Sequence, residues 1–308
     1  MKILFMGTPE FAKVHLKALF DAGQKIVGAV CQSDKPTGRK KELTAPPVKI
    51  CCTDNNIPIY QPDTLKNNAI EPLLKELDPE LIVVVAYGKI LPEYVLNYPK
   101  YGCINVHGSL LPKYRGAAPV QRAIIEGEKV TGVTIMYMDK GIDTGDIILK
   151  SECEIAEDDD GETLFKKLEP VGVEAMIQAI KLIEQGKVSR IKQNDEESTY
   201  AAMLDSTTGE IDWNNDNNAV HNLVRGTYPW PCAFSFYNGQ KFKILKAVKS
   251  DKCGKPGEII VSDCKEGLIV ACRTGAVKVL NLQFEGGKKM PACDYIRGHE
   301  MKVKAILG

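Results

Sequence analysis

Short, wholly apolar runs alternate with a helical repeat near the start of the chain, and this pattern restricts the fold more than any other feature. The runs at 2–6 (KILFM), 25–32 (KIVGAVCQ) and 81–86 (LIVVVA) are typical of strands that are buried on both faces. Between the first two, apolar residues recur at helical spacing from Phe11 to Ala22. Strand–helix–strand units build parallel sheets covered by helices. We therefore predict an α/β fold with a Rossmann-like, mostly parallel, doubly wound sheet.

The turn after the first strand reads Gly7-Thr8-Pro9. It lacks the G-x-G-x-x-G spacing with which dinucleotide-binding turns approach a pyrophosphate, so we expect no NAD-type cofactor. Thr8 is expected to cap the following helix, with Pro9 at its first position.

The stretch from Tyr101 to Asp146 holds the polar residues best suited to chemistry. Asn105, His107 and Ser109 alternate at the end of a short apolar run, so they are expected to point to one side of a strand end. Asp143 lies in a turn bracketed by glycines, between the apolar runs 133–138 and 147–149. A turn between two strands presents its side chains at the rim of a sheet.

These residue types suit the attack of an amine on an acyl group. An amide and an imidazole can both donate hydrogen bonds to a carbonyl oxygen that gains negative charge. A nearby carboxylate can orient the imidazole and receive a proton through a water molecule. No Cys or Ser paired with a base accompanies them in this stretch, which favours direct attack over a covalent acyl-enzyme. The same spacing also fits a simple strand end and turn.

A basic loop that contains prolines follows the second predicted strand, at 33–49 (SDKPTGRKKELTAPPVK). Ligands of open α/β sheets bind beyond the carboxyl ends of the strands, where this loop lies. Its cations either contact phosphates or form an ordinary solvated surface.

The chain of 308 residues is long enough for two domains, and its charge is uneven. Residues 206–308 hold 15 Lys and Arg against 10 Asp and Glu, and the rest of the chain has the opposite excess. The polar segment 186–205 is the expected linker. Short, evenly spaced strands then predict a small C-terminal OB-like β-barrel in 206–308. Its positive charge suggests a polyanionic partner bound through phosphates, although such an excess also arises by chance.

The spacing of the cysteines and the length of the apolar runs indicate in which cellular compartment the protein is expected. Ten Cys are scattered without a C-x-x-C spacing, and only four His are present, so no zinc pattern occurs. No apolar run approaches the roughly 20 residues of a membrane span, and no secretory signal is recognisable. We expect a cytoplasmic monomer with reduced thiols, no metal and no membrane contact.

Three motifs together resemble the active-site signature of the folate-dependent formyltransferases. They are Asn-Val-His-Gly-Ser-Leu-Leu-Pro at 105–112, Arg-Gly-Ala-Ala-Pro at 115–119 and Gly-Ile-Asp-Thr-Gly-Asp at 141–146. The resemblance extends from Met1 to the last residues and is closest to the members that act on methionyl-tRNA. It implies a formyltransferase catalytic domain over 1–185 and a tRNA-binding domain over 206–308.

The resemblance also implies the reaction, in which the formyl group of 10-formyltetrahydrofolate passes to the α-amine of methionine on initiator tRNA. The family's catalytic trio would be Asn105, His107 and Asp143. The residues implied to bind the folate are Ser109, Leu110, Leu111, Pro112, Tyr87, Gly88, Ile90 and Leu91, although Ile90 and Leu91 equally fit a place in the core. The loop residues implied to contact tRNA are Arg39, Lys40 and Lys41.

Two other functions fit part of the pattern. A formyltransferase for an amino-sugar nucleotide or a purine precursor would share the trio, but would not require a basic loop and a basic C-terminal part. A non-catalytic RNA-binding protein would require a broken site, whereas the trio is intact in the sequence.

Overall fold

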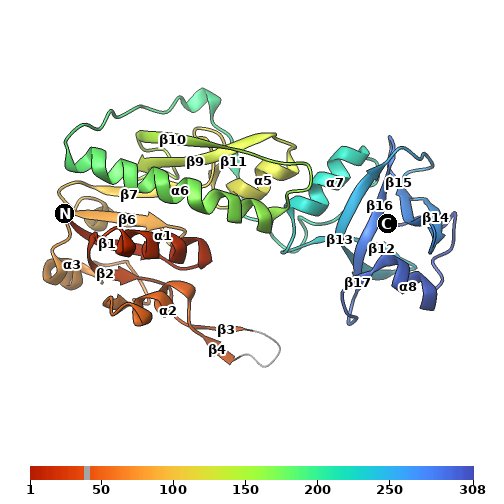
Figure 1. The fold of residues 1–308 in the computed structure, drawn as a ribbon, viewed down its shortest axis with the longest axis horizontal. Helices are drawn as coiled ribbons and strands as arrows, with labels where there is room; N and C mark the ends of the chain where they lie inside the picture. Colours follow the sequence, from red (N-terminus) through yellow and green to blue (C-terminus); the bar gives the residue numbers. More distant parts are fainter. Residues whose placement is uncertain (38–41) are drawn as a thin grey trace. The chain divides into compact units, whose positions relative to one another are not determined.

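The computed structural model describes residues 1–37 and 42–308 (Figure 1). Arg39, Lys40 and Lys41, which were predicted to contact tRNA, lie outside the described residues. The chain forms two compact units. The first comprises Met1–Gly116, Thr131–Glu154 and Phe165–Tyr200, and the second comprises Ala117–Val130, Ile155–Leu164 and Ala201–Gly308.

The first unit is built on a seven-stranded sheet with the order β10-β9-β7-β6-β1-β2-β5. In that order the strands are Ile147–Glu154, Val130–Tyr137, Cys103–His107, Leu81–Val85, Lys2–Gly7, Lys25–Val30 and Ile59–Tyr60. The strands from β7 to β5 are parallel, and β9 is antiparallel to β7. The predicted mostly parallel sheet is therefore confirmed. Chain order reverses between β1 and β6, which is where open α/β sheets bind ligands.

Helices cover both faces of this sheet. On one face lie α1 (Glu10–Asp21) and α6 (Gly161–Glu184), where the rings of Phe11 and Phe165 are 5.8 Å apart (Figure 1). Helix α6 continues through Pro170 as one helix. Leu74 of α3 (Glu71–Leu77) and Val95 of α4 (Glu93–Leu96) join a core with alternate residues of β1 and β6. Helix α2 (Pro47–Asp54) packs against α1, and β3 (Lys35–Thr37) pairs with β4 (Glu42–Thr44).

The prediction that Thr8 caps α1 is wrong. Pro9 is the N-cap residue, and no side chain accepts a hydrogen bond there. The Thr8 hydroxyl instead donates to the carbonyl oxygen of Tyr87 and accepts from the main-chain N–H of Gln32, both at 3.3 Å. Thr8 thus joins the carboxyl ends of β1, β2 and β6, because long-range hydrogen bonds replace the local one.

The second unit contains a six-stranded antiparallel sheet with the order β12-β13-β16-β15-β14, and β17 pairs with β16. The strands β12 to β17 are Ala233–Tyr237, Gln240–Ser250, Ile259–Asp263, Gly267–Ala271, Ala276–Phe284 and Met290–Pro291. Stacked rings of Phe242 and Phe284, with centroids 4.9 Å apart, lie in its core. Its helices are α5 (Pro119–Ile125), α7 (Asn217–Gly226) and α8 (Ala292–Gly298).

Three short elements complete the described chain: β8 (Arg115–Gly116), β11 (Tyr200–Ala201) and a 3-10 turn at Asp195–Glu197. Over the described residues, none of the helices combines the length and the apolar character that crossing a bilayer requires.

Candidate active site

Three polar side chains converge beside β7. Asn105 and His107 are two residues apart on this strand, so they point to the same face. The loop between β9 and β10 brings Asp143 to that face. One carboxylate oxygen, Oδ1, accepts a hydrogen bond from Asn105 Nδ2 at 3.4 Å, and the other, Oδ2, lies 3.6 Å from His107 Nδ1. The amide, imidazole and carboxylate anticipated from the sequence therefore share one site.

The orientation of the His107 ring is set by its buried nitrogen. Nε2 lies 2.8 Å from the carbonyl oxygen of Tyr114, and only 5% of the side chain is exposed. A carbonyl oxygen only accepts hydrogen bonds, so Nε2 carries a hydrogen and donates it. Nδ1 is left facing Asp143, and a second proton on the ring would lie against the carboxylate.

The Asp143 loop has a shape that few sequences allow. Asp143 has a positive φ of 54°, and its Oδ2 also accepts the main-chain N–H of Gly116 at 2.8 Å. A Cβ atom at Gly145 would lie 1.9 Å from the carbonyl oxygen of Tyr137, which only glycine avoids. Asp139 closes the loop, because its Oδ1 accepts from the Thr144 hydroxyl at 2.6 Å.

Sequence reasoning missed a group of residues that hold this loop from outside. Gln193 Nε2 donates to the carbonyl oxygens of Asp143 and Gly145, both at 2.8 Å. Arg115 Nε donates to Gln193 Oε1 at 3.0 Å, and Arg115 Nη2 donates to Asp195 Oδ1 at 2.7 Å. Gln193 and Asp195 fall in the segment predicted as a linker, where the lack of periodicity concealed them. The only signal was the position of Arg115 in a recognisable motif.

Ser109 does not join the trio, although it was expected on the same side. It is fully buried, and its hydroxyl donates to the carbonyl oxygen of Lys113 at 2.7 Å. Its own carbonyl oxygen accepts from the Thr134 hydroxyl at 2.6 Å. Leu111 is likewise buried, whereas Leu110 and Pro112 are partly exposed. Strand β7 ends at His107, so the alternation of faces stops before Ser109.

The segment after β6 divides into a buried and an exposed part. Tyr87 and Leu91 belong to the core, whereas Gly88 is exposed and 82% of Ile90 is exposed. Of the two interpretations that the sequence left open, the core position applies to Leu91 and not to Ile90. Burial raises the pKa of Tyr87 to about 12. Val84 pairs with Asn105, which places this segment beside the trio.

An amide, an imidazole and a carboxylate beyond the strands of an open α/β sheet suit transfer of an acyl group, and comparison with known proteins specifies the class. The family model for formyl transferases matches residues 1–180, and the model for the formyl transferase C-terminal domain matches residues 203–300. Methionyl-tRNA formyltransferase of Acetivibrio thermocellus is 48% identical, and that of Caldanaerobacter subterraneus is 47% identical, each over all of both chains. The chain belongs to the methionyl-tRNA formyltransferase family.

A solved structure has a similar fold. HypX from Aquifex aeolicus, in complex with tetrahydrofolic acid, aligns with a TM-score of 0.67 over 96% of this chain and 47% of that one. The identity is 18%, so the likeness concerns the fold alone.

Proposed function

We propose that this protein transfers the formyl group of 10-formyltetrahydrofolate to the free amino group of methionyl-initiator tRNA, giving N-formylmethionyl-tRNA for translation initiation. The observation that carries the proposal is the convergence of Asn105, His107 and Asp143. The chain also matches methionyl-tRNA formyltransferases over its whole length. A sugar-nucleotide or purine acceptor is not favoured, because these relatives are named for methionyl-tRNA.

The geometry suggests how each side chain contributes. An Asn amide carries two hydrogens, so Asn105 can contact Asp143 with one and the formyl oxygen of the substrate with the other. Positive charge on His107 stabilises that oxygen as it becomes negative. Asp143 fixes the imidazole and takes up the proton of the attacking amine through water, and a proton returns through the same water to N10 of the folate as its bond to the formyl carbon breaks. Each donor of this kind typically lowers the barrier by about 3 kcal/mol.

The folate donor is proposed to bind at the carboxyl ends of β6 and β7, and β6 adjoins the point where chain order reverses. The exposed Gly88 and Ile90 would contact it, together with Leu110 and Pro112. The buried Tyr87, Leu91, Ser109 and Leu111 would support these residues from behind. HypX, which shares the fold, forms a complex with tetrahydrofolic acid, and by analogy we propose a folate-derived donor for this chain.

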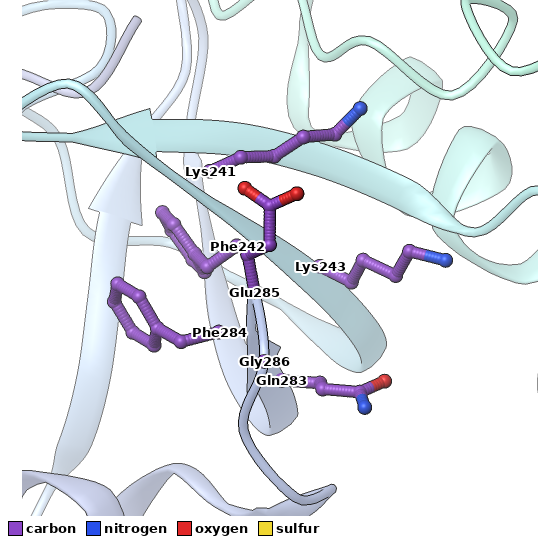
Figure 2. A pocket seen from close by; sticks show the side chains of 7 residues that line it. All are labelled: Lys241, Phe242, Lys243, Gln283, Phe284, Glu285 and Gly286. Carbon is purple, nitrogen blue, oxygen red and sulfur yellow. The ribbon is translucent and has the colours of Figure 1, made fainter. Parts of the chain in front are cut away.

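Residues 206–308, proposed to form an OB-like barrel, are the proposed tRNA-binding domain, joined by the linker 186–205 to the catalytic domain 1–185. A pocket on the sheet of the second unit is lined by Lys241 and Lys243 (Figure 2). Figure 2 shows these side chains directed away from the rings of Phe242 and Phe284. Glu285 lines the same pocket and offsets one positive charge.

Arg39, Lys40 and Lys41 are proposed to bind further phosphates of the tRNA. The protein is also proposed to be a cytoplasmic monomer.

Formylation of charged tRNA tests the proposal. The purified protein is incubated with 10-formyltetrahydrofolate and with methionine attached to either initiator or elongator tRNA. We expect N-formylmethionine only with initiator tRNA and only in the presence of the folate. Formylation of an amino sugar or a purine precursor, together with no formylation of methionyl-tRNA, would contradict the proposal.

A further inference from the structure

The Asp143 loop is held by hydrogen bonds from a side chain to main-chain carbonyl oxygens, which sequence motifs do not reveal. Two of its carbonyl oxygens, those of Asp143 and Gly145, point toward the side-chain amide of Gln193. An amide NH2 group has two hydrogens, and both are used here at 2.8 Å. The donor therefore binds the loop on both sides of Thr144.

The orientation of the Gln193 amide is fixed from behind. Its Oε1 accepts from Arg115 Nε, which can only donate. The opposite orientation would place the amide oxygen against two carbonyl oxygens and the NH2 group against a guanidinium. Arg115 is itself buried and is held by Asp195. We refer to Gln193, Arg115 and Asp195 as the Gln193 bridge.

The same part of the chain also supports His107. The hydroxyl of Thr199 accepts the N–H of Tyr114 at 2.8 Å, and the Thr199 carbonyl oxygen accepts the N–H of Arg115 at 2.9 Å. Tyr114 in turn presents its carbonyl oxygen to His107 Nε2. Residues 193–199 thus position both His107 and Asp143.

We propose that Gln193 is a positioning residue for the formyl-transfer reaction. By holding the carbonyl oxygens of Asp143 and Gly145, it keeps Asp143 at a positive φ with its carboxylate directed at Asn105 and His107. Gln193 acts through Asp143. The proposal rests on the proposed function for its catalytic readout, but the loop geometry is testable without it.

Gln193→Glu is the sharpest test, because Glu has nearly the same shape, still accepts from Arg115 and has no hydrogen to donate to the carbonyl oxygens. We expect kcat to fall by about tenfold to a hundredfold, the scale of a slight misplacement of a reacting group. The KM values for the folate and for methionyl-tRNA should change by less than about threefold, since Gln193 binds neither substrate. Gln193→Met repeats the test without the charge, and exposed Lys192→Gln is the matched control.

A double-mutant cycle distinguishes positioning from a general structural role. In an Asp143→Ala background, Gln193→Glu should lower the remaining kcat by less than about twofold, because the group that it orients is gone. The proposal would be overturned if Gln193→Glu lowered kcat as much in the Asp143→Ala background as it does in the parent. It would also be overturned if both single Gln193 variants kept a kcat within about twofold of the parent.

Hydrogen exchange of the protein without substrates provides the readout that does not depend on activity. Both Gln193 variants should accelerate exchange in the peptide that covers residues 139–146 and leave the β1 and β6 peptides unchanged. If the parent failed to formylate methionyl-tRNA, the proposed function would fall and this comparison would still decide whether Gln193 holds the loop. Unchanged exchange in that peptide, or acceleration throughout the unit, would overturn the proposal.

Discussion

At the scale of single residues, the site consists of few groups with fixed directions. Asn105 and His107 are aligned by the strand that carries them, and Asp143 is aligned by Gly116 and Gln193. Catalysis by such groups depends on their being placed before the substrate arrives. Removing one should therefore affect the rate far more than the fold.

Asn105→Ala and His107→Ala should each lower kcat by roughly a hundredfold or more, because each removes a group that we propose stabilises the developing negative charge. Asp143→Ala should have a comparable effect through His107. Single-turnover kinetics at saturating substrates measures the decrease, and circular dichroism checks the fold. A folded variant that keeps near-normal kcat would show that the assigned role is wrong.

His15 links stability to pH. It is fully buried, its Nδ1 lies 2.7 Å from the carbonyl oxygen of Phe11, and its Nε2 has no hydrogen-bond partner among the described residues. Burial lowers the pKa of His15 to about 4. Between pH 6.5 and 4 the unfolded chain thus binds a proton that the folded chain does not, so stability falls as pH falls.

His15→Leu should remove this contribution. Urea unfolding measures the free energy of unfolding at pH 7 and at pH 4.5. We expect this free energy to decrease between the two pH values by about 2 to 3 kcal/mol less in the variant than in the parent. His299→Leu, at an exposed histidine, is the control and should retain the parent's pH dependence. An identical decrease in His15→Leu and the parent would contradict this assignment.

At the scale of elements, the antiparallel β9 and the loop that follows it complete a site that β7 begins. The apolar runs of β1 and β6 predicted those strands because burial on both faces leaves no polar alternation. The place of Asp143 was predictable for a similar reason, since a glycine-bracketed turn between apolar runs indicates a hairpin.

Gly145→Ala should distort this loop, because its Cβ would meet the carbonyl oxygen of Tyr137. We expect kcat to fall by about tenfold or more, since Asp143 is displaced from His107. Gly298→Ala, where the added Cβ has no atom of another described residue within 4 Å apart from its own helix and chain neighbours, should leave kcat unchanged. Normal turnover in Gly145→Ala would show that the loop shape does not matter to the reaction.

At the scale of the whole molecule, the sequence predicted what depends on local pattern. The parallel sheet, the antiparallel strands of the second unit and the trio all follow from periodicity or from recognisable motifs. The Gln193 bridge and the hydrogen bonds of Thr8 could not be predicted, because they join positions far apart in the chain. Strand β17 and helix α8 were also missed, since each is short and lies in a polar segment.

The basic loop provides a test at the same scale. Replacing Arg39, Lys40 and Lys41 by Ala should raise the KM for methionyl-tRNA and leave kcat nearly unchanged. The dependence of log KM on log salt concentration should become shallower by about one unit for each phosphate that the variant no longer binds. Lys75→Ala, at a surface lysine paired with Glu71, is the control. An unchanged salt slope would favour a small acceptor.

Three consecutive residues touch the site at three points. Tyr114 meets His107, Arg115 meets Gln193 and Gly116 meets Asp143, and main-chain atoms make two of these three hydrogen bonds. Inserting or deleting one residue in this segment would shift all three hydrogen bonds at once. Exchanging a side chain would affect at most one of these hydrogen bonds. Natural variation within 114–116 should therefore preserve the length of this segment more strictly than its composition.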